Sequence, residues 1–312
     1  MREKRNFAKR TRISELDRTR KKYFLIYEGS STEEIYFKAV NELRNKIDIN
    51  PLIELVSIER TYSEYGWSNP KKILEQLLKD LEEMESGKIS YKTLVDKIME
   101  IIIEDKKNSE EISLKEFLED IENEIGKSLN DIVENTEDDC RILLPIILKK
   151  GFLIIEKIPS ILEKILKGIE NKQITYSEDI DKICLIVDRD KGSFKEEQYN
   201  YVKEECKRKN FKFYVTNPCF EFWLLLHFDE VHSIDKEKLL ENNKITPKSK
   251  VRYVEAELKK YFSYNKNKYN AELLIEKIDS AIENEKRFCE DIEELKDKLG
   301  SNVGLLIKEL KN

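Results

Sequence analysis

Cysteine and histidine are scarce among the 312 residues of the chain. The five cysteines are scattered and odd in number, and no two form a Cys-x-x-Cys pair, which is typical of reduced thiols in the cytoplasm. The two histidines, His227 and His232, have no cysteine partner at zinc spacing. A zinc finger is therefore excluded, and any metal ion bound by the chain is expected to have oxygen ligands.

Long apolar runs are missing too. The longest, such as Ile142–Leu148, are far shorter than the roughly 20 residues of a membrane-spanning helix. The first residues, MREKRNFAKRTR, contain no apolar region that could serve as a secretory signal. Charged residues make up 38% of the chain. These features predict a soluble, cytoplasmic protein with no membrane partner.

Charge is unevenly distributed along the chain. Residues 1–22 have a net charge of +7, whereas the whole chain is at −6. A basic N-terminal arm on an acidic body suggests a phosphate-rich partner such as nucleic acid. A solvated tail without a partner explains the same composition, and both interpretations remain open at this point.

Two short apolar runs end abruptly in acidic residues. Ile183–Val187 has the composition of a buried strand, and Asp188, Asp190 and Gly192 follow it. The similar run Tyr23–Tyr27 is followed by Glu28 and a glycine. Aspartate and glycine are ordinary turn residues, so one such strand end has no special meaning. Repetition of the pattern requires another explanation.

The segments after these runs predict β-α-β units. Capping boxes at Ser31/Glu34 and Ser193/Glu196 would each begin a helix, and strands are expected near 52–58 and 211–216. After the last strand, Asn217-Pro218 resembles a helix N-cap followed by proline at the first helical position. The helix so begun, CFEFWLLLHF, is apolar almost all round and has one charge, Glu221, in its first turn. We therefore expect an α/β fold with a parallel sheet flanked by helices.

In such a sheet the acids converge at one edge. Glu28, Asp188, Asp190 and Glu221 each follow a predicted strand, and open α/β sheets bind ligands at the carboxyl edge of their strands. Four carboxylates placed there would repel one another unless a cation neutralised them. The pattern predicts a Mg²⁺ site, with Mn²⁺ as the alternative ion.

Three regions surround these strands. We assign residues 1–22 to the basic arm, 23–69 and 177–312 to the sheet-containing core with a helical C-terminal part, and 70–176 to a large all-α insertion rich in Leu, Ile, Lys and Glu. Scaffolding, partner binding and assembly of a homo-oligomer all suit this insertion. In the C-terminal part, helices are expected near 249–262, 270–295 and 301–310.

The stretch YFSYNKNKYN, residues 261–270, alternates aromatic and basic residues. Lys266 and Lys268 lie among four aromatic rings, a composition suited to a phosphodiester backbone with stackable bases. A lysine-rich turn between helices would have the same composition. Together with Arg189 and Lys191 beside the acids, these lysines are the candidates for holding a phosphate group.

The chain resembles known families at these segments. An apolar strand ending in Glu-Gly and a later one ending in Asp-x-Asp resemble the Toprim domain of topoisomerases, primases and OLD-type nucleases. The match is closer to the RloB family of bacterial defence proteins, also found in AbiL-type abortive-infection systems. It is formed by YFLIYEG (23–29), TEEIYF (32–37), IVDRD (186–190) and, most specifically, NPCFEFWLLLHF (217–228). The resemblance extends over residues 1–60 and 180–312, and the insertion is larger than expected for the family.

The resemblance implies a Mg²⁺-dependent Toprim-type nuclease acting on DNA or RNA in anti-phage defence. Glu28 matches the general acid/base and metal ligand of the Toprim domain, and Asp188 and Asp190 match its metal-binding pair. Glu33 and Glu221 match acids of the RloB pattern, Glu221 as a further metal ligand and Glu33 in an accessory role. The resemblance also implies an ABC/SMC-like ATPase partner encoded nearby.

Other functions suit part of the pattern. A Toprim-shaped binding or regulatory subunit of an ATPase-containing complex would keep the acids without cleaving anything. A phosphatase of the haloacid dehalogenase type also has Asp-x-Asp after a strand, but there the motif normally comes early and is followed by Thr or Val, where this chain has Gly192. A topoisomerase would require a gate and a tyrosine-bearing domain for which the chain has no room.

Overall fold

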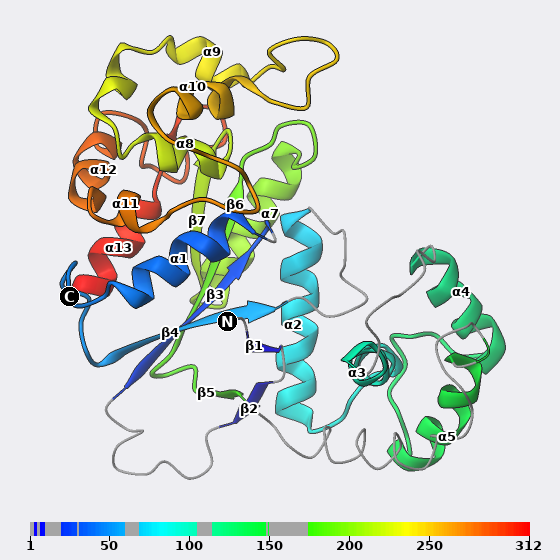
Figure 1. Cartoon of the computed structure of the whole chain (residues 1–312). Coiled ribbons are helices and arrows are strands. Elements are labelled where there is room, and N and C mark those ends of the chain that lie inside the picture. Colours follow the sequence, from blue (N-terminus) through cyan, green and yellow to red (C-terminus); the bar gives the residue numbers. More distant parts are fainter. Residues whose placement is uncertain are drawn as a thin grey trace.

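The computed structural model of the chain describes residues 3–4, 7–9, 20–29, 31–59, 69–104, 114–147, 149 and 174–312 (Figure 1). Within these residues a six-stranded sheet has the order β1-β4-β3-β6-β7-β8. Its strands are β1 (Glu3–Lys4), β3 (Lys21–Tyr27), β4 (Ile53–Glu59), β6 (Lys182–Asp188), β7 (Lys212–Asn217) and β8 (Gly300–Ser301). Neighbouring strands are parallel except β7 and β8. The predicted α/β class with a mostly parallel sheet is confirmed.

The central strand β3 is buried on both faces. Tyr23, Leu25 and Tyr27 pack into one apolar cluster, whereas Phe24 and Ile26 pack into another on the opposite side. Side chains alternate between the two faces of a strand, and parallel sheets are normally covered on both faces. The run Tyr23–Tyr27 is apolar at every position because β3 lies between two layers of helices.

The first face of the sheet is covered by α1 and the C-terminal helices. Their bounds are α1 (Thr32–Glu42), α8 (Phe220–Leu225), α9 (Lys236–Glu241), α10 (Tyr253–Tyr261), α11 (Glu272–Ile275), α12 (Ile278–Glu285) and α13 (Val303–Lys311). All six residues of α8 are buried, as its composition predicts. The single helix expected over 270–295 is wrong, because two short helices and a series of turns occupy these residues.

The opposite face is covered by α2 (Pro70–Ser86) and α7 (Glu196–Arg208). Ile73, Leu74 and Leu77 of α2 share an apolar cluster with Ile183 and Leu185 of the central strand β6. Although the sequence analysis assigned residues 70–176 to the insertion, α2 is thus part of the layer that covers the sheet.

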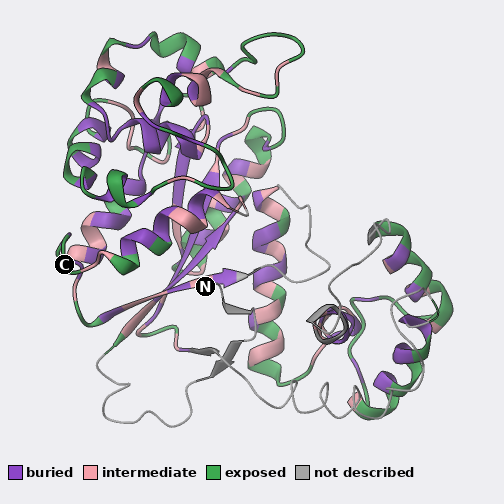
Figure 2. Ribbon diagram, in the orientation of Figure 1, coloured by how far each residue is buried: buried purple, intermediate pink, exposed green. Residues whose placement is uncertain are grey.

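A separate apolar cluster forms beyond α2. It is built by α3 (Tyr91–Glu104), α4 (Leu114–Ile125) and α5 (Thr136–Ile147). Figure 2 shows buried residues on the inner sides of these helices and exposed residues on their outer sides. Most of the remaining insertion, 150–173, lies outside the described residues.

The predicted basic arm, residues 1–22, is described only in part, since 10–19 lie outside the described residues. Glu3–Lys4 pairs with β4, and β2 (Phe7–Lys9) pairs with β5 (Ile174–Tyr176) in a small parallel sheet. All five cysteines are free thiols. None of the helices in the described ranges combines the length and the apolar composition that crossing a bilayer requires.

Both predicted capping boxes are wrong in detail. Ser31 precedes α1, but its side chain forms no capping hydrogen bond. At the other helix the N-cap position is Lys195, whose backbone N–H donates to Gln198 Oε1 over 2.9 Å. The helices begin within three residues of the predicted positions, but neither is capped by the side chain of the predicted serine.

Beyond its short pairing with β8, the outer edge of β7 is closed by the side chain of Asn302. Its Oδ1 accepts the Val215 N–H over 2.6 Å, and its Nδ2 donates to the Phe213 carbonyl over 3.3 Å. The Asn302 backbone N–H donates to the Val215 carbonyl over 3.2 Å. This asparagine is buried and supplies β7 with hydrogen bonds that a neighbouring strand would otherwise make.

Replacing Asn302 with alanine is therefore expected to destabilise the protein. The change leaves the Val215 N–H and one bond of the Phe213 carbonyl without a partner, at a cost of about 2–4 kcal/mol in the free energy of unfolding. Urea denaturation followed by circular dichroism measures this cost. The control is Asn243→Ala, because Asn243 is exposed and its amide donates to Glu241. Equal stability of N302A and N243A would contradict this role.

Candidate active site

Three neighbouring strands bring their carboxyl ends together. β3 pairs with β6 in a register that sets Tyr27 opposite Ile186, and β6 pairs with β7 so that Asp188 lies opposite Thr216. The ladder continues one residue further, since the Glu28 N–H donates to the Ile186 carbonyl over 3.1 Å. Glu28 and Asp188 therefore lie at adjacent strand ends, as the sequence predicted.

Asp188 links the strand ends to the start of α8. Its backbone N–H donates to Glu28 Oε2 over 3.0 Å, and its Oδ1 accepts the Phe220 N–H over 2.8 Å. The predicted cap at Asn217 is wrong, because Asn217 ends β7, the Asn217–Pro218 peptide bond is cis, and α8 begins at Phe220. The N–H of Phe220, the first residue of α8, instead donates to the carboxylate of Asp188 at the end of β6.

Like charges crowd around Asp188. Burial and then the carboxylates of Glu28, Glu33 and Glu221 hold the pKa of Asp188 well above its usual range, while the Lys266 ammonium opposes them. A carboxyl group surrounded by three others resists ionisation, because each neighbouring negative charge raises the cost of adding another. The structure therefore brings together Glu28, Asp188 and Glu221 of the predicted set, together with Glu33.

Glu221 is held by a lysine and a tyrosine. Lys266 Nζ lies 2.8 Å from Glu221 Oε1, and the Tyr264 hydroxyl donates to the same oxygen over 3.0 Å. Burial alone would raise the pKa of Glu221, but the Lys266 ammonium outweighs burial, and the net shift is downward. A buried glutamate thus stays ionised beside Asp188 because an internal cation accompanies it.

Glu33 folds back onto the turn after β3. The Gly29 N–H donates to Glu33 Oε1 over 3.1 Å. A Cβ atom at position 29 would lie 2.2 Å from Glu33 Oε2, so the glycine of the Glu-Gly pair leaves space for a carboxylate. Glu33 is buried and lies in the first turn of α1, which follows β3 closely and so places this side chain in the site.

Asp190 lies beside this cluster and faces the turn that follows it. Its Oδ1 accepts the Gly192 N–H over 2.9 Å, and its carbonyl accepts the N–H groups of Ser193 and Phe194. Lys191 is exposed and lies 3.8 Å from Asp297 Oδ1. Asp188 and Asp190 therefore have different surroundings, although the sequence presents them as a pair.

Arg189, a predicted phosphate contact, lines the cavity described below but packs mainly against the protein. Its guanidinium is buried, lies over the rings of Phe194 and Tyr199, and donates a hydrogen bond to the Phe194 carbonyl. These contacts pack the turn onto α7. Alternation along the chain explains this placement, because consecutive residues at a strand end point to opposite sides.

The aromatic residues of 261–270 are not an exposed stacking surface. Tyr264 is buried against Thr32 and Glu221, and the Tyr269 hydroxyl donates to the Thr32 carbonyl over 2.6 Å. These rings fasten the segment to the start of α1 and thereby position Lys266. Lys268, two residues later, is exposed.

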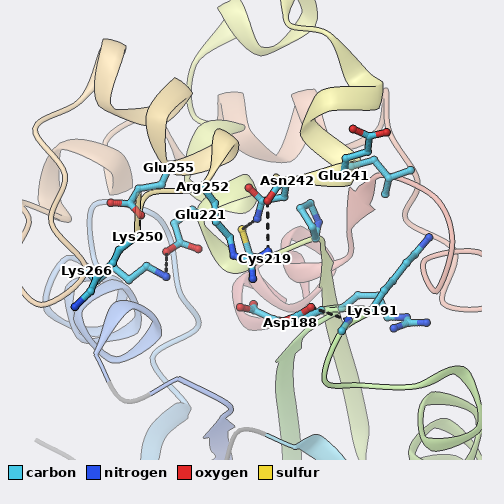
Figure 3. Close-up of a pocket in the computed structure, with 15 residues that line it drawn as sticks. Asp188, Lys191, Cys219, Glu221, Glu241, Asn242, Lys250, Arg252, Glu255 and Lys266 are labelled. Carbon is cyan, nitrogen blue, oxygen red and sulfur yellow. Dashed lines mark hydrogen bonds and ion pairs between the residues drawn. The ribbon is translucent and has the colours of Figure 1, made fainter. Parts of the chain in front are cut away.

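A cavity of about 540 Å³ opens next to the carboxylates (Figure 3). One side is formed by the residues after β6 and β7, including Asp188, Asp190, Lys191 and Glu221. The other side was not anticipated from the sequence. It is formed by Leu240, Glu241, Asn242, Lys250, Arg252 and Glu255. No motif marks these residues, and they reach the site because α9 and α10 fold over α8.

The donor atoms in the site are the oxygens that Mg²⁺ prefers. Among the described residues, however, no three Asp, Glu, His or Cys side chains are already arranged to hold one ion. Asp188 is engaged by the Phe220 amide and Glu221 by Lys266. The set of donors fits a divalent cation in its chemistry, and its binding would require these side chains to exchange partners.

Comparison with known families agrees with the sequence pattern. The family model described as RloB-like protein matches residues 23–310, nearly the whole chain. No curated protein and no solved structure matches it.

The Lys266–Glu221 ion pair makes a testable contribution to stability. Lys266→Met is expected to lower the free energy of unfolding at pH 7 by about 1–3 kcal/mol, less than for a fully buried pair, because the lysine side chain is 60% exposed. Ion pairing lowers the pKa of Glu221 from its usual 4.5, so its contribution is present above that pH and disappears as the pH falls through the folded-state pKa.

Urea denaturation at a series of pH values between 7 and 4 measures this effect. The difference between wild type and K266M should be largest at pH 7 and should shrink towards pH 4, because Glu221 takes up a proton in the variant first. The control is Lys268→Met in the same segment. A pH-independent difference would assign the effect to lost packing of the lysine stem.

Proposed function

The chain belongs to the RloB-like family, and we propose that it is a metal-dependent nuclease with a Toprim-like core. The observation that supports this most is the environment of Asp188, which lies at the end of a central strand among Glu28, Glu33 and Glu221. Parallel α/β sheets bind their ligands at this edge. Crowded carboxylates at such an edge are typical of enzymes that bind a cation together with a phosphate.

The proposed cation is Mg²⁺ or Mn²⁺, held by Asp188, Glu28 and Glu221, with Asp190 at the cavity side. When bound, it would act as a Lewis acid on the phosphate and favour ionisation of a water molecule. Burial and then the neighbouring carboxylates raise the pKa of Asp188, and a divalent ion held there would offset both, which supports the assignment. Lys266, which now neutralises Glu221, would then be released towards the cavity.

Glu28 is the proposed general base. The Asp188 backbone N–H holds its Oε2 at 3.0 Å, which fixes the carboxylate at the strand end next to Asp188. A base fixed in this way can take a proton from an attacking water without first being oriented. Lys191 and Lys266 line the same cavity and are the proposed contacts for the phosphate under attack.

The biological setting is proposed from the family. From the RloB resemblance we propose that this chain acts in bacterial anti-phage defence, in the cytoplasm, beside an ABC/SMC-like ATPase partner. Both DNA and RNA have the phosphodiester bond that the site would cleave.

A binding or regulatory subunit is the second candidate. Two observations favour it: Lys266 already neutralises Glu221, and no three metal-binding side chains of the described residues are arranged around one point. A protein that only used the acids for structure would keep this ion pair in every state.

Cation binding provides the first test. Mg²⁺ or Mn²⁺ should raise the melting temperature of the wild type, with a stabilisation of about 2.7 kcal/mol at a hundredfold excess over Kd. Asp188→Asn should abolish the rise, whereas Asp190→Asn should reduce it, because Asp190 lies outside the cluster around Asp188. Differential scanning fluorimetry measures both. The control is Asp179→Asn, an exposed acid in the turn before β6. A wild-type response in D188N would place the cation elsewhere.

Cleavage provides the second test. Glu28→Gln retains an oxygen that can accept the Asp188 N–H but removes the charge and the ability to take a proton. The cleavage rate on plasmid, single-stranded DNA or tRNA should fall by about 10²-fold or more, while folding and nucleic-acid affinity stay close to wild type. Glu178→Gln, an exposed acid, is the matched control. An unchanged rate in E28Q would remove Glu28 from the reaction, and a wild type that cleaves none of these with either metal would support the binding subunit.

A further inference from the structure

The cavity beside the carboxylates has a second wall with its own chemistry. Residues 240–242 at the end of α9 and residues 250–255 around the start of α10 face the strand ends across it. In Figure 3, Glu241 and Asn242 lie on the side of the cavity opposite Asp188, while Lys191 lies at one end and Lys250 and Lys266 at the other. The cavity is therefore much larger than a cation requires.

Positive charges on this wall are available to a ligand. Within the described part of the chain, Lys250 and Arg252 form no ion pair with a carboxylate, and both are exposed. Of the acids that line the cavity, Glu255 pairs with Lys259 over 2.5 Å and Glu221 pairs with Lys266 over 2.8 Å, whereas Glu241 accepts a hydrogen bond from the Asn243 amide. An anion that enters the cavity would meet two uncompensated cations a short way from the carboxylates.

The position of Arg252 is fixed by a buried asparagine. Asn242 adopts a left-handed conformation with φ of 45°, which asparagine tolerates better than most residues. Its carbonyl accepts from Arg252 Nη1 over 3.4 Å, its Oδ1 accepts the Val254 N–H over 3.0 Å, and its Nδ2 donates to Cys219 Sγ over 3.4 Å. Through Asn242, the loop that bears Arg252 is attached two residues before Glu221, so the cationic wall keeps a defined position relative to the acids.

The size and lining of the cavity limit its ligand. A volume of about 540 Å³ lies within the range of about 300–1,000 Å³ found for small-ligand pockets, so it suits one nucleotide unit and is too small for a duplex. None of the described residues that line it is aromatic. Base stacking, which dominates many single-strand sites, is therefore absent here, and contacts to the backbone remain.

We propose that this cavity binds one nucleotide of a single-stranded nucleic acid through its backbone. Lys250 and Arg252 would bind the phosphate that is adjacent, along the strand, to the phosphate under attack beside Asp188. The inference rests on the proposed function and adds the form of its substrate, which is an unpaired strand read without regard to base sequence. Asn242 is a positioning residue for Arg252. The wall is separate from the metal-binding acids, so it can be tested without a cation and without cleavage.

The experiment is fluorescence anisotropy with labelled DNA and RNA oligonucleotides of about 12 nucleotides, a length within the footprint of known single-strand sites, in EDTA. The variants are Lys250→Gln, Arg252→Gln and the double variant, and the matched control is Lys248→Gln, an exposed lysine of the same loop that does not line the cavity. The double variant should raise Kd about tenfold at low salt and reduce the salt slope by about 0.7, the value for one lost phosphate on a single strand.

Each outcome decides the proposal. Weaker binding of K250Q and R252Q with K248Q within about twofold of wild type, on homopolymers of different bases alike, supports a backbone subsite. The DNA and RNA arms show which sugar is preferred. Equal effects of K248Q and K250Q, unchanged binding in the double variant, or no binding of either polymer by the wild type overturns it. Because K250Q alters an exposed side chain, it tests the wall even if R252Q fails to fold.

Failure of this proposal differs from failure of the proposed function. A protein that binds strands through Lys250 and Arg252 but never cleaves them retains the subsite and loses the nuclease. A protein whose cleavage depends on Glu28 but whose binding ignores Lys250 and Arg252 retains the nuclease and loses the subsite.

Discussion

Repulsion among carboxylates at one edge of the sheet is the constraint on which the rest of the site depends. Asp188 ends a central strand beside Glu28, Glu33 and Glu221, and its pKa is raised by burial and then by their charges. Such a cluster is stable only when cations and N–H groups compensate it. The Phe220 amide and the Lys266 ammonium provide that compensation, and each comes from a segment that the fold must bring to this edge.

The C-terminal third of the chain therefore builds the site as much as the sheet does. Tyr264 and Tyr269 fasten their segment to α1 and so place Lys266 on Glu221. Asn242 attaches the loop with Arg252 to Cys219. These contacts make the cavity a feature of the folded core, and both acids and cations line each of its two sides.

Several sequence predictions were right because they depended on local pattern. Short apolar runs with acids after them correctly predicted parallel strands and a carboxylate cluster, and the composition of α8 correctly predicted a buried helix. Predictions about single side chains were less successful. Arg189 packs under the turn, the rings of 261–270 are largely buried, and the expected cap at Asn217 is replaced by Asp188. In each case a contact in the folded chain determined where the side chain lies, and the composition of the local segment does not reveal that contact.

The sequence by itself determined the class of fold, the edge of the sheet where the acids gather and the family to which the chain belongs. These follow from periodicity and from motifs of a few adjacent residues, which act over short distances along the chain. Only the tertiary structure separated Asp188 from Asp190, placed Glu33 against Gly29 near Asp188, paired Lys266 with Glu221 and brought Lys250 and Arg252 to the cavity. The physical reason is that charge interactions depend on distance in space, and residues 188, 221, 252 and 266 become neighbours only when the helices pack over the sheet.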